Sequence, residues 1–181
     1  MLVLQHGTCR LFELFAARPG PGAGWSADAG AVFDLRSNAL RPEGWTSADA
    51  AGLPILPGLV RYEEVRAGRI THAIRFTVER SQRAYVHPAT HFASTSTDPA
   101  LPPMGLRLRL RASFATAGFP RDARVILEAL KTYGLIVADN GSDWFFQGAS
   151  DPRWDDEALG ALNRVPGTAF EVVRSGPIVR G

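Results

Sequence analysis

A single glutamate interrupts an apolar row near the start of the chain. In the predicted strand 9–16, Glu13 shares one side with Leu11 and Phe15, because alternate residues of a strand face the same way. A carboxyl group in such a row is either paired with an arginine or kept neutral by a raised pKa. A carboxyl of the second kind is what enzymes use as a general acid. Glu13 is therefore the predicted acid, with a structural glutamate–arginine bridge as the alternative.

Glycoside hydrolysis requires a second carboxylate beside such an acid, as base or nucleophile. Asp34 and Asp139, each at the end of a predicted strand, are the candidates for this role. His72 and His91 are the candidate polar neighbours of the pair. These residues together predict a catalytic site for a carbohydrate-active hydrolase.

Sugar-binding groups are expected from the long segment 36–65 and from the region after residue 140. Segments longer than about 15 residues without regular structure are often functional. Asn38, Arg41 and Trp45 supply amide, cationic and aromatic groups in the first segment, and Trp144 supplies a second aromatic platform. The same residue types would serve a non-catalytic glycan-binding or cell-surface module, and turn or cap roles are the structural alternative in the segment.

Histidine spacing raises a third possibility, a metal-dependent enzyme. His87 and His91 are four residues apart, which on a helix would place both imidazoles on one face. Pro88 argues against a helix, and on a strand the two residues would lie about 13 Å apart, too far to share an ion. A metal site would need a sharp bend and further ligands from His72 or Asp98. We therefore predict no metal and no cofactor.

Established catalytic motifs are absent from the sequence. It contains no nucleophile elbow, no HExxH zinc motif, no Walker loop and no dinucleotide fingerprint. Cys9 is the sole cysteine, so an internal disulfide is excluded, and a lone strand cysteine is most often a small buried hydrophobe.

The clearest local pattern is a helix over residues 120–134. Apolar residues recur there at helical spacing, and Gly134 follows at the position where a left-handed residue usually ends a helix. Residues 135–138 form a short apolar run, residues 139–141 have turn chemistry, and residues 144–147 are predicted to return as a strand. This pattern predicts a helix packed on a hairpin.

The remaining elements indicate a β-rich α+β protein. Leucines alternate with arginines over residues 106–111, as expected of a strand with one buried face. Further strands are predicted at 2–4, 9–16, 25–35, 70–78 and 170–173, and a short C-terminal helix at 155–162. We predict one domain over residues 1–181, a curved β-sandwich or barrel with the 120–134 helix packed on it.

Composition restricts the partners. The formal net charge is +2, with 20 basic and 18 acidic residues, and Lys131 is the sole lysine. Basic residues are not clustered with aromatics, so no nucleic-acid partner is expected. No run of about 18 apolar residues is present, so we expect no membrane-spanning segment. A carbohydrate remains the expected ligand, with the oligomeric state left open.

The chain resembles a family of uncharacterised bacterial proteins at CRLFELF, GAVFDLRSNALRPEGWTSADAAGLPILPGLVRYEEV, THAIRFTV, HFASTSTDPALPPMGLRLRL and ALKTYGLIVADNGSDWFFQGASDPRWDD. The resemblance covers residues 9–173, and it corresponds to the C-terminal portion of larger, exported proteins. It implies a secreted or extracellular location but brings no established activity. His72, His91 and Asp139 match the family pattern, whereas His87 stands where that pattern usually has tryptophan.

Overall fold

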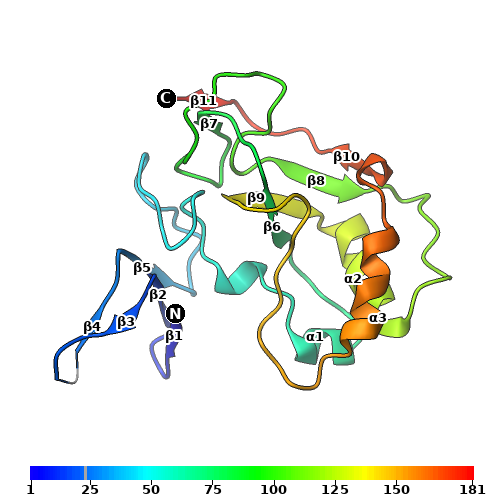
Figure 1. The fold of residues 1–181 in the computed structure, drawn as a ribbon, viewed down its shortest axis with the longest axis horizontal. Helices are drawn as coiled ribbons and strands as arrows, with labels where there is room; N and C mark the ends of the chain where they lie inside the picture. Colours follow the sequence, from blue (N-terminus) through cyan, green and yellow to red (C-terminus); the bar gives the residue numbers. More distant parts are fainter. Residues whose placement is uncertain (23) are drawn as a thin grey trace.

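The computed structural model describes residues 1–22 and 24–181, and it has the β-rich α+β architecture predicted from the sequence (Figure 1). Its strands are β1 Leu2–Gln5, β2 Arg10–Phe15, β3 Arg18–Pro19, β4 Trp25–Ser26, β5 Ala29–Asp34, β6 Ile74–Val78, β7 Ala84–Tyr85, β8 Arg107–Leu110, β9 Leu135–Asn140, β10 Phe170–Val172 and β11 Val179–Arg180. Its α-helices are α1 Tyr62–Arg66, α2 Arg121–Thr132 and α3 Asp156–Gly160, and short 3₁₀ turns lie at Leu56–Gly58, Ala161–Arg164 and Gly167–Ala169.

The main sheet has four strands in the order β10-β8-β9-β6. Strands β6 and β9 are parallel, whereas β8 is antiparallel to both β9 and β10. The strand interiors are strongly apolar, and Ile74, Phe76 and Val137 have no exposed surface. These residues belong to the large hydrophobic core, which also contains the inner face of α2.

Helix α2 confirms the predicted helix and shows why it stops. Ile126, Leu127 and Leu130 lie on its buried face. Gly134 follows the helix with φ +77°, and a Cβ atom there would lie 2.2 Å from the carbonyl oxygen of Leu108. Glycine is thus required by both the left-handed backbone and the close approach of β8.

The predicted hairpin after α2 is wrong in its pairing. The segment after β9 does turn back, but it runs beside β6 rather than beside β9. Phe146 forms an antiparallel bridge with Phe76, and the amide of Thr77 donates to the carbonyl of Phe145 at 2.8 Å. Strand β6 therefore lies between the two segments that the sequence pattern had paired.

The N-terminal sheet, of order β1-β2-β5, has a small core of its own (Figure 1). Its buried cluster consists of Leu11, Ala31 and Phe33, with Leu2 and Leu56 packed against it. Over the described residues the sheets do not close into a barrel. The predicted barrel is not found, and α2 rather than a second large sheet covers the four-stranded sheet.

The predicted C-terminal helix is present as α3 and the 3₁₀ turn that continues it, and α3 packs against α2. Asp155 caps α3, because its side chain accepts a hydrogen bond from the amide of Ala158 at 3.0 Å. In the part of the chain that the structure describes, no helix has the length and apolar character needed to cross a membrane.

Candidate functional site

Glu13, the predicted acid, is completely buried. It points inward from β2, and its Oε1 accepts hydrogen bonds from the backbone amides of Ile55 at 2.7 Å and Leu56 at 3.1 Å. Burial raises the pKa of Glu13, although the two amides and the nearby Arg75 oppose the rise. The raised pKa agrees with the prediction, but a carboxyl without exposed surface touches no substrate. In this structure Glu13 fastens β2 to the segment that follows residue 54.

Arg75 stands at the centre of a buried polar cluster. Its Nη2 atom lies 3.4 Å from Oδ2 of Asp49 and 3.9 Å from Oδ2 of Asp139, and its Nη1 donates to Gln147. Burial raises the pKa of Asp49 to about 7, against the attraction of Arg75, and burial also raises the pKa of Asp139. One guanidinium thus faces several carboxyls inside the protein.

Two atoms of this cluster are buried and have no hydrogen-bond partner among the described residues, Oε2 of Glu13 and Nε of Arg75. Asp139 is the member with the most exposed carboxyl, its side chain being 36% exposed. None of the three cavities described for the molecule is lined by Glu13, Asp49, Arg75 or Asp139. Arg75 of β6 connects to β9 through Asp139 and to the segment 47–53 through Asp49, and the burial of Glu13 gives a substrate no route to its carboxyl.

Asp34 lies on the opposite face of the N-terminal sheet from Glu13. Glu13 pairs with Ala31 across the sheet, and Asp34 is three residues further along β5, so the two side chains face opposite ways. Asp34 is exposed and accepts hydrogen bonds from Arg36, which hold its pKa well below the usual range. The structure therefore does not bring Glu13 and Asp34 together as a catalytic pair.

The two histidines proposed as polar neighbours are engaged separately. Nδ1 of His72 lies 2.9 Å from the carbonyl of the next residue, and its Nε2 lies 3.2 Å from the carboxylate of Glu64. Nδ1 of His91 lies 2.8 Å from the carbonyl of Ala50. Hydrogen bonds of this kind fix the orientation of an imidazole ring.

The histidine metal site has no support in the geometry. His87 contacts Glu43, with Nε2 2.6 Å from Oε1, and so has a different partner from either His72 or His91. Among the described residues, no three His, Cys, Asp or Glu side chains come together in a way that would hold a metal ion. The sharp bend that the metal hypothesis required does not unite the three histidines.

The predicted ligand groups of the segment 36–49 lie at the surface and do not form a cavity. The guanidinium of Arg41 lies 5.3 Å from the centre of the Trp45 ring and also donates to the carbonyl of Thr46. Trp45 is 57% exposed, and Asn38 is exposed as well. None of these three residues lines any of the cavities described.

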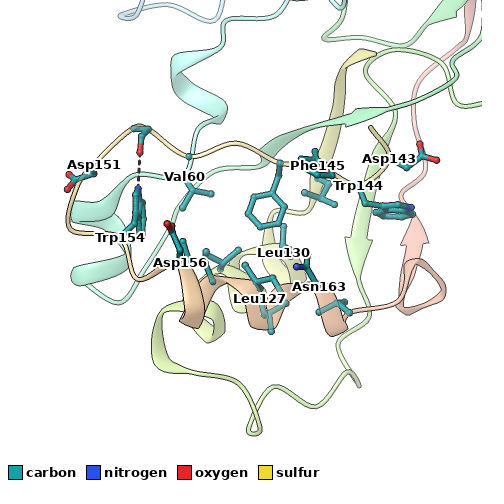
Figure 2. A pocket seen from close by; sticks show the side chains of 18 of the residues that line it. Val60, Leu127, Leu130, Asp143, Trp144, Phe145, Asp151, Trp154, Asp156 and Asn163 are labelled. Atoms are coloured by element: carbon teal, nitrogen blue, oxygen red, sulfur yellow. Dashed lines mark hydrogen bonds between the residues drawn. The ribbon is translucent and has the colours of Figure 1, made fainter. Parts of the chain in front are cut away.

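The largest of the three cavities described lies elsewhere, between α2, α3 and the segment 143–156, and it has a volume of about 740 Å³. Figure 2 shows Trp154 at one end and Trp144 at the other, with Leu127 and Leu130 of α2 beneath. Its aromatic lining is formed by Trp144, Phe145, Phe146, Trp154 and Phe170, and its polar lining includes Asp143, Ser150, Asp151, Asp156 and Asn163. An apolar cavity with a few polar groups is typical of ligand sites.

Trp144 is held in place by its neighbours. Its ring stacks on Phe76 with centroids 5.7 Å apart and lies 5.1 Å from the centre of the Phe170 ring. A Cβ atom at Gly167 would come within 2.9 Å of the same indole. Trp144 also has φ +62°, a conformation that side-chain-bearing residues rarely adopt and that often marks functional sites. The residue as a whole is still 44% exposed.

Trp154 is fixed equally well at the other end. Its indole Nε1 donates to the carbonyl of Ala149 at 2.9 Å, and its ring meets Tyr62 edge-on with centroids 5.2 Å apart. Arg153 covers the same tyrosine ring at 4.1 Å and is paired with Asp151. Both tryptophans are therefore positioned before any ligand arrives.

The three aspartates of the cavity differ in their surroundings. Hydrogen bonds from Arg153 lower the pKa of Asp151 to about 2 and compensate its charge. Oδ1 of Asp143 accepts the backbone amide of Glu79 at 2.7 Å. Asp143 and Asp156 have no cationic partner among the described residues. Negative charge therefore remains at the cavity.

Of the residues predicted from the sequence, Trp144 is the one that lines this cavity. Sequence reasoning missed Phe145, Trp154, Asp143, Asp156 and Asn163. Two local signals were available: Phe145 belongs to an uninterrupted run of three aromatic residues, and Trp154 directly precedes the acidic start of α3. Neither signal reveals that Phe145 and Trp154 line the same cavity together with residues of α2.

Comparisons of the chain with protein-family models, with curated proteins and with solved structures found no match.

Proposed function

We propose that this protein binds carbohydrate in the cavity between α2, α3 and the segment 143–156. One observation carries the proposal: fixed aromatic rings and hydrogen-bonding groups line the same cavity of about 740 Å³. Sugars present apolar C–H faces, which pack on aromatic rings, and hydroxyl groups, which bond to carboxylates and amides. The size lies within the range of roughly 300–1,000 Å³ that is usual for small-ligand sites.

Binding is favoured over the predicted hydrolase mechanism. The carboxyls whose pKa values are raised, Glu13, Asp49 and Asp139, are outside the lining of the cavity. An acid with a raised pKa must contact the glycosidic oxygen to protonate it. The non-catalytic glycan-binding module is accordingly the first proposal. Export of the protein, which the family resemblance implies, would bring such a module to polysaccharides outside the cell.

Hydrolysis remains the second candidate because two carboxylates, Asp143 and Asp156, line the same cavity. In Figure 2 they lie towards opposite ends of it, Asp156 beside Trp154 and Asp143 beside Trp144. Catalysis would need one of them as acid and the other as base or nucleophile. Product analysis of each bound polysaccharide decides between the candidates. New reducing ends that vanish in both Asp143→Asn and Asp156→Asn would replace the binding proposal with a hydrolase.

The binding proposal is tested by Phe145→Ala. Phe145 lines the cavity and is 64% exposed, so its truncation removes an aromatic surface without opening the core. We expect calorimetric titration with a panel of soluble polysaccharides to show at least about tenfold weaker binding for the variant.

The matched control is Trp25→Ala, which removes an aromatic residue of similar exposure, 57%, on β4. This variant should bind as the unmodified protein does. Equal binding by Phe145→Ala, or no binding of any polysaccharide by the unmodified protein, would refute the proposal.

A further inference from the structure

A second cavity, of about 440 Å³, adjoins the first at Trp144. The two cavities share four lining residues, Asp143, Trp144, Gly167 and Phe170. The second cavity continues over the main sheet, where its lining includes Leu108 of β8, Val172 of β10 and the pair Glu79 and Arg80 after β6. The rings of Trp144 and Phe170 are thus a wall common to both cavities.

This arrangement suits an extended ligand better than a compact one. Trp144 is fixed by Phe76, Phe170 and Gly167, yet 44% of its surface stays exposed. A chain that crosses this exposed surface contacts the indole and reaches a cavity on each side. A single chain loses its translational freedom only once on binding, so the contacts that it makes in the second cavity increase its affinity.

The charge of the lining restricts the chemistry of the chain. Among the described residues that line the first cavity there is no lysine or arginine, whereas three aspartates are present. Arg153 compensates Asp151, which leaves the charges of Asp143 and Asp156. Carboxylates beside aromatic rings attract a cationic ligand through two interactions, ion pairs with the carboxylates and cation–π contacts with the faces of the rings. The same field opposes uronic acids and sulfated sugars.

We propose that the two cavities together bind a linear oligosaccharide that carries free amino groups, with Trp144 in contact with the middle of the chain. This inference rests on the proposed carbohydrate binding and adds both the length and the charge of the ligand. Amino groups in the first cavity pair with Asp143 and Asp156. Units beyond Trp144 lie in the second cavity, against Leu108 and Val172.

The test compares β-1,4-linked glucosamine oligomers of two and six units with N-acetylglucosamine and galacturonate oligomers of the same lengths, by calorimetry at low ionic strength and about pH 6. We expect the glucosamine hexamer to bind at least about tenfold more tightly than its dimer. It should bind about fivefold more tightly than the acetylated hexamer, with the difference lost at high salt. The galacturonate hexamer should bind most weakly.

Two variants locate these effects. Asp156→Asn should reduce the preference for the amine form, whereas Glu157→Gln, which removes an exposed charge from the same turn of α3 outside the cavity lining, should not. Val172→Arg puts a long side chain at the second cavity from a residue that is 63% exposed. It should lower the affinity for the hexamer to nearly that of the dimer and leave the dimer unchanged.

The outcomes separate this inference from the proposed function. Equal affinity for dimer and hexamer would overturn the two-cavity site, and equal or tighter binding of the acetylated or galacturonate hexamer would overturn the amine preference. Either result leaves carbohydrate binding in place. If none of the sugars, including those of the wider panel, binds the folded protein, the proposed function itself fails.

Discussion

The buried Asp49 gives the protein an unusual dependence of stability on pH. Its carboxyl accepts hydrogen bonds from the amides of Ala51 and Leu53, both at 3.1 Å, but burial still raises its pKa to about 7. Between about pH 4 and 7 the folded protein therefore keeps a proton that the unfolded chain has lost. The unfolded state binds fewer protons in this window, so the free energy of unfolding falls as the pH rises.

The variant Asp49→Asn tests this prediction. In urea titrations the unmodified protein should be less stable at pH 8 than at pH 5, by on the order of 1–3 kcal/mol. Asparagine does not ionise, so the variant should show a clearly smaller difference. The exposed Asp98→Asn serves as control and should behave as the unmodified protein. An identical pH dependence in the Asp49 and Asp98 variants would contradict the assignment.

At the scale of single residues, the sequence predicted the direction in which the pKa of Glu13 shifts but not the hydrogen-bond partners of its carboxyl. An apolar row around Glu13 correctly indicated burial and a raised pKa. It did not reveal that the backbone amides of Ile55 and Leu56 would donate hydrogen bonds to this carboxylate, because those residues are more than forty positions away in the sequence. The spacing of residues along one strand predicts which side chains share a face of that strand. The hydrogen-bond partners of a side chain depend on which distant segments the fold brings to it.

At the scale of elements, the turn between α2 and β9 requires glycine. Gly134→Ala would place a Cβ atom 2.2 Å from the carbonyl oxygen of Leu108 and would retain a positive φ. We expect the variant to lose at least about 1–3 kcal/mol in the free energy of unfolding, measured by urea titration. Gly118→Ala, where the added atom meets nothing within 4 Å, is the control and should change stability little. A loss in Gly134→Ala no larger than in the control would contradict this account.

Gly167 lines both cavities and also lies directly against the ring of Trp144. A Cβ atom there would lie 2.9 Å from the indole, so Gly167→Ala must displace the ring. We expect this variant to bind carbohydrate several-fold more weakly while unfolding within about 1 kcal/mol of the unmodified protein. Gly160→Ala on α3, where space is open, should retain full affinity. Unchanged binding in Gly167→Ala would show that the exact position of Trp144 does not matter.

The elements themselves were predictable to different degrees. Helix α2 was predicted from the spacing of Ile126, Leu127 and Leu130, because that periodicity is local and strong. The partner of the 144–147 segment was not, because β6 comes between it and β9 in the folded sheet. Strand pairing depends on contacts far apart in sequence, which periodicity does not encode.

At the scale of the whole molecule, the structure separates two kinds of carboxyl group. Those with raised pKa values bind other parts of the fold: Asp49 and Asp139 lie beside Arg75 of β6, and Glu13 accepts hydrogen bonds from the segment after residue 54. Those without a cationic partner among the described residues, Asp143 and Asp156, lie at the largest cavity. The first group contributes to the packing of the fold, and the second is the group that we propose contacts a ligand.

The cavity could not be predicted from the sequence because its lining residues come from several distant segments. Its walls come from Val60, from α2, from the segment 143–156 and from the residues after α3, and no single stretch of chain carries the pattern. The β-rich α+β class could be predicted, because it depends on local composition, and Trp144 is the predicted ligand residue that lies in the cavity lining. Whether the strands close into a barrel could not be predicted from local patterns, since closure of a sheet depends on the order in which its strands pair.

Hydrogen–deuterium exchange with the tightest-binding oligosaccharide of the panel locates the segments of the chain that a bound sugar protects. It distinguishes the cavity from the Arg41–Trp45 pair, which the sequence offered among the candidate sugar-binding groups. We expect slower exchange on binding for amides of residues 143–156 and 159–167, and unchanged exchange for residues 36–49. Protection confined to residues 36–49, or no protection of the segment around Trp144 despite saturating ligand, would contradict it.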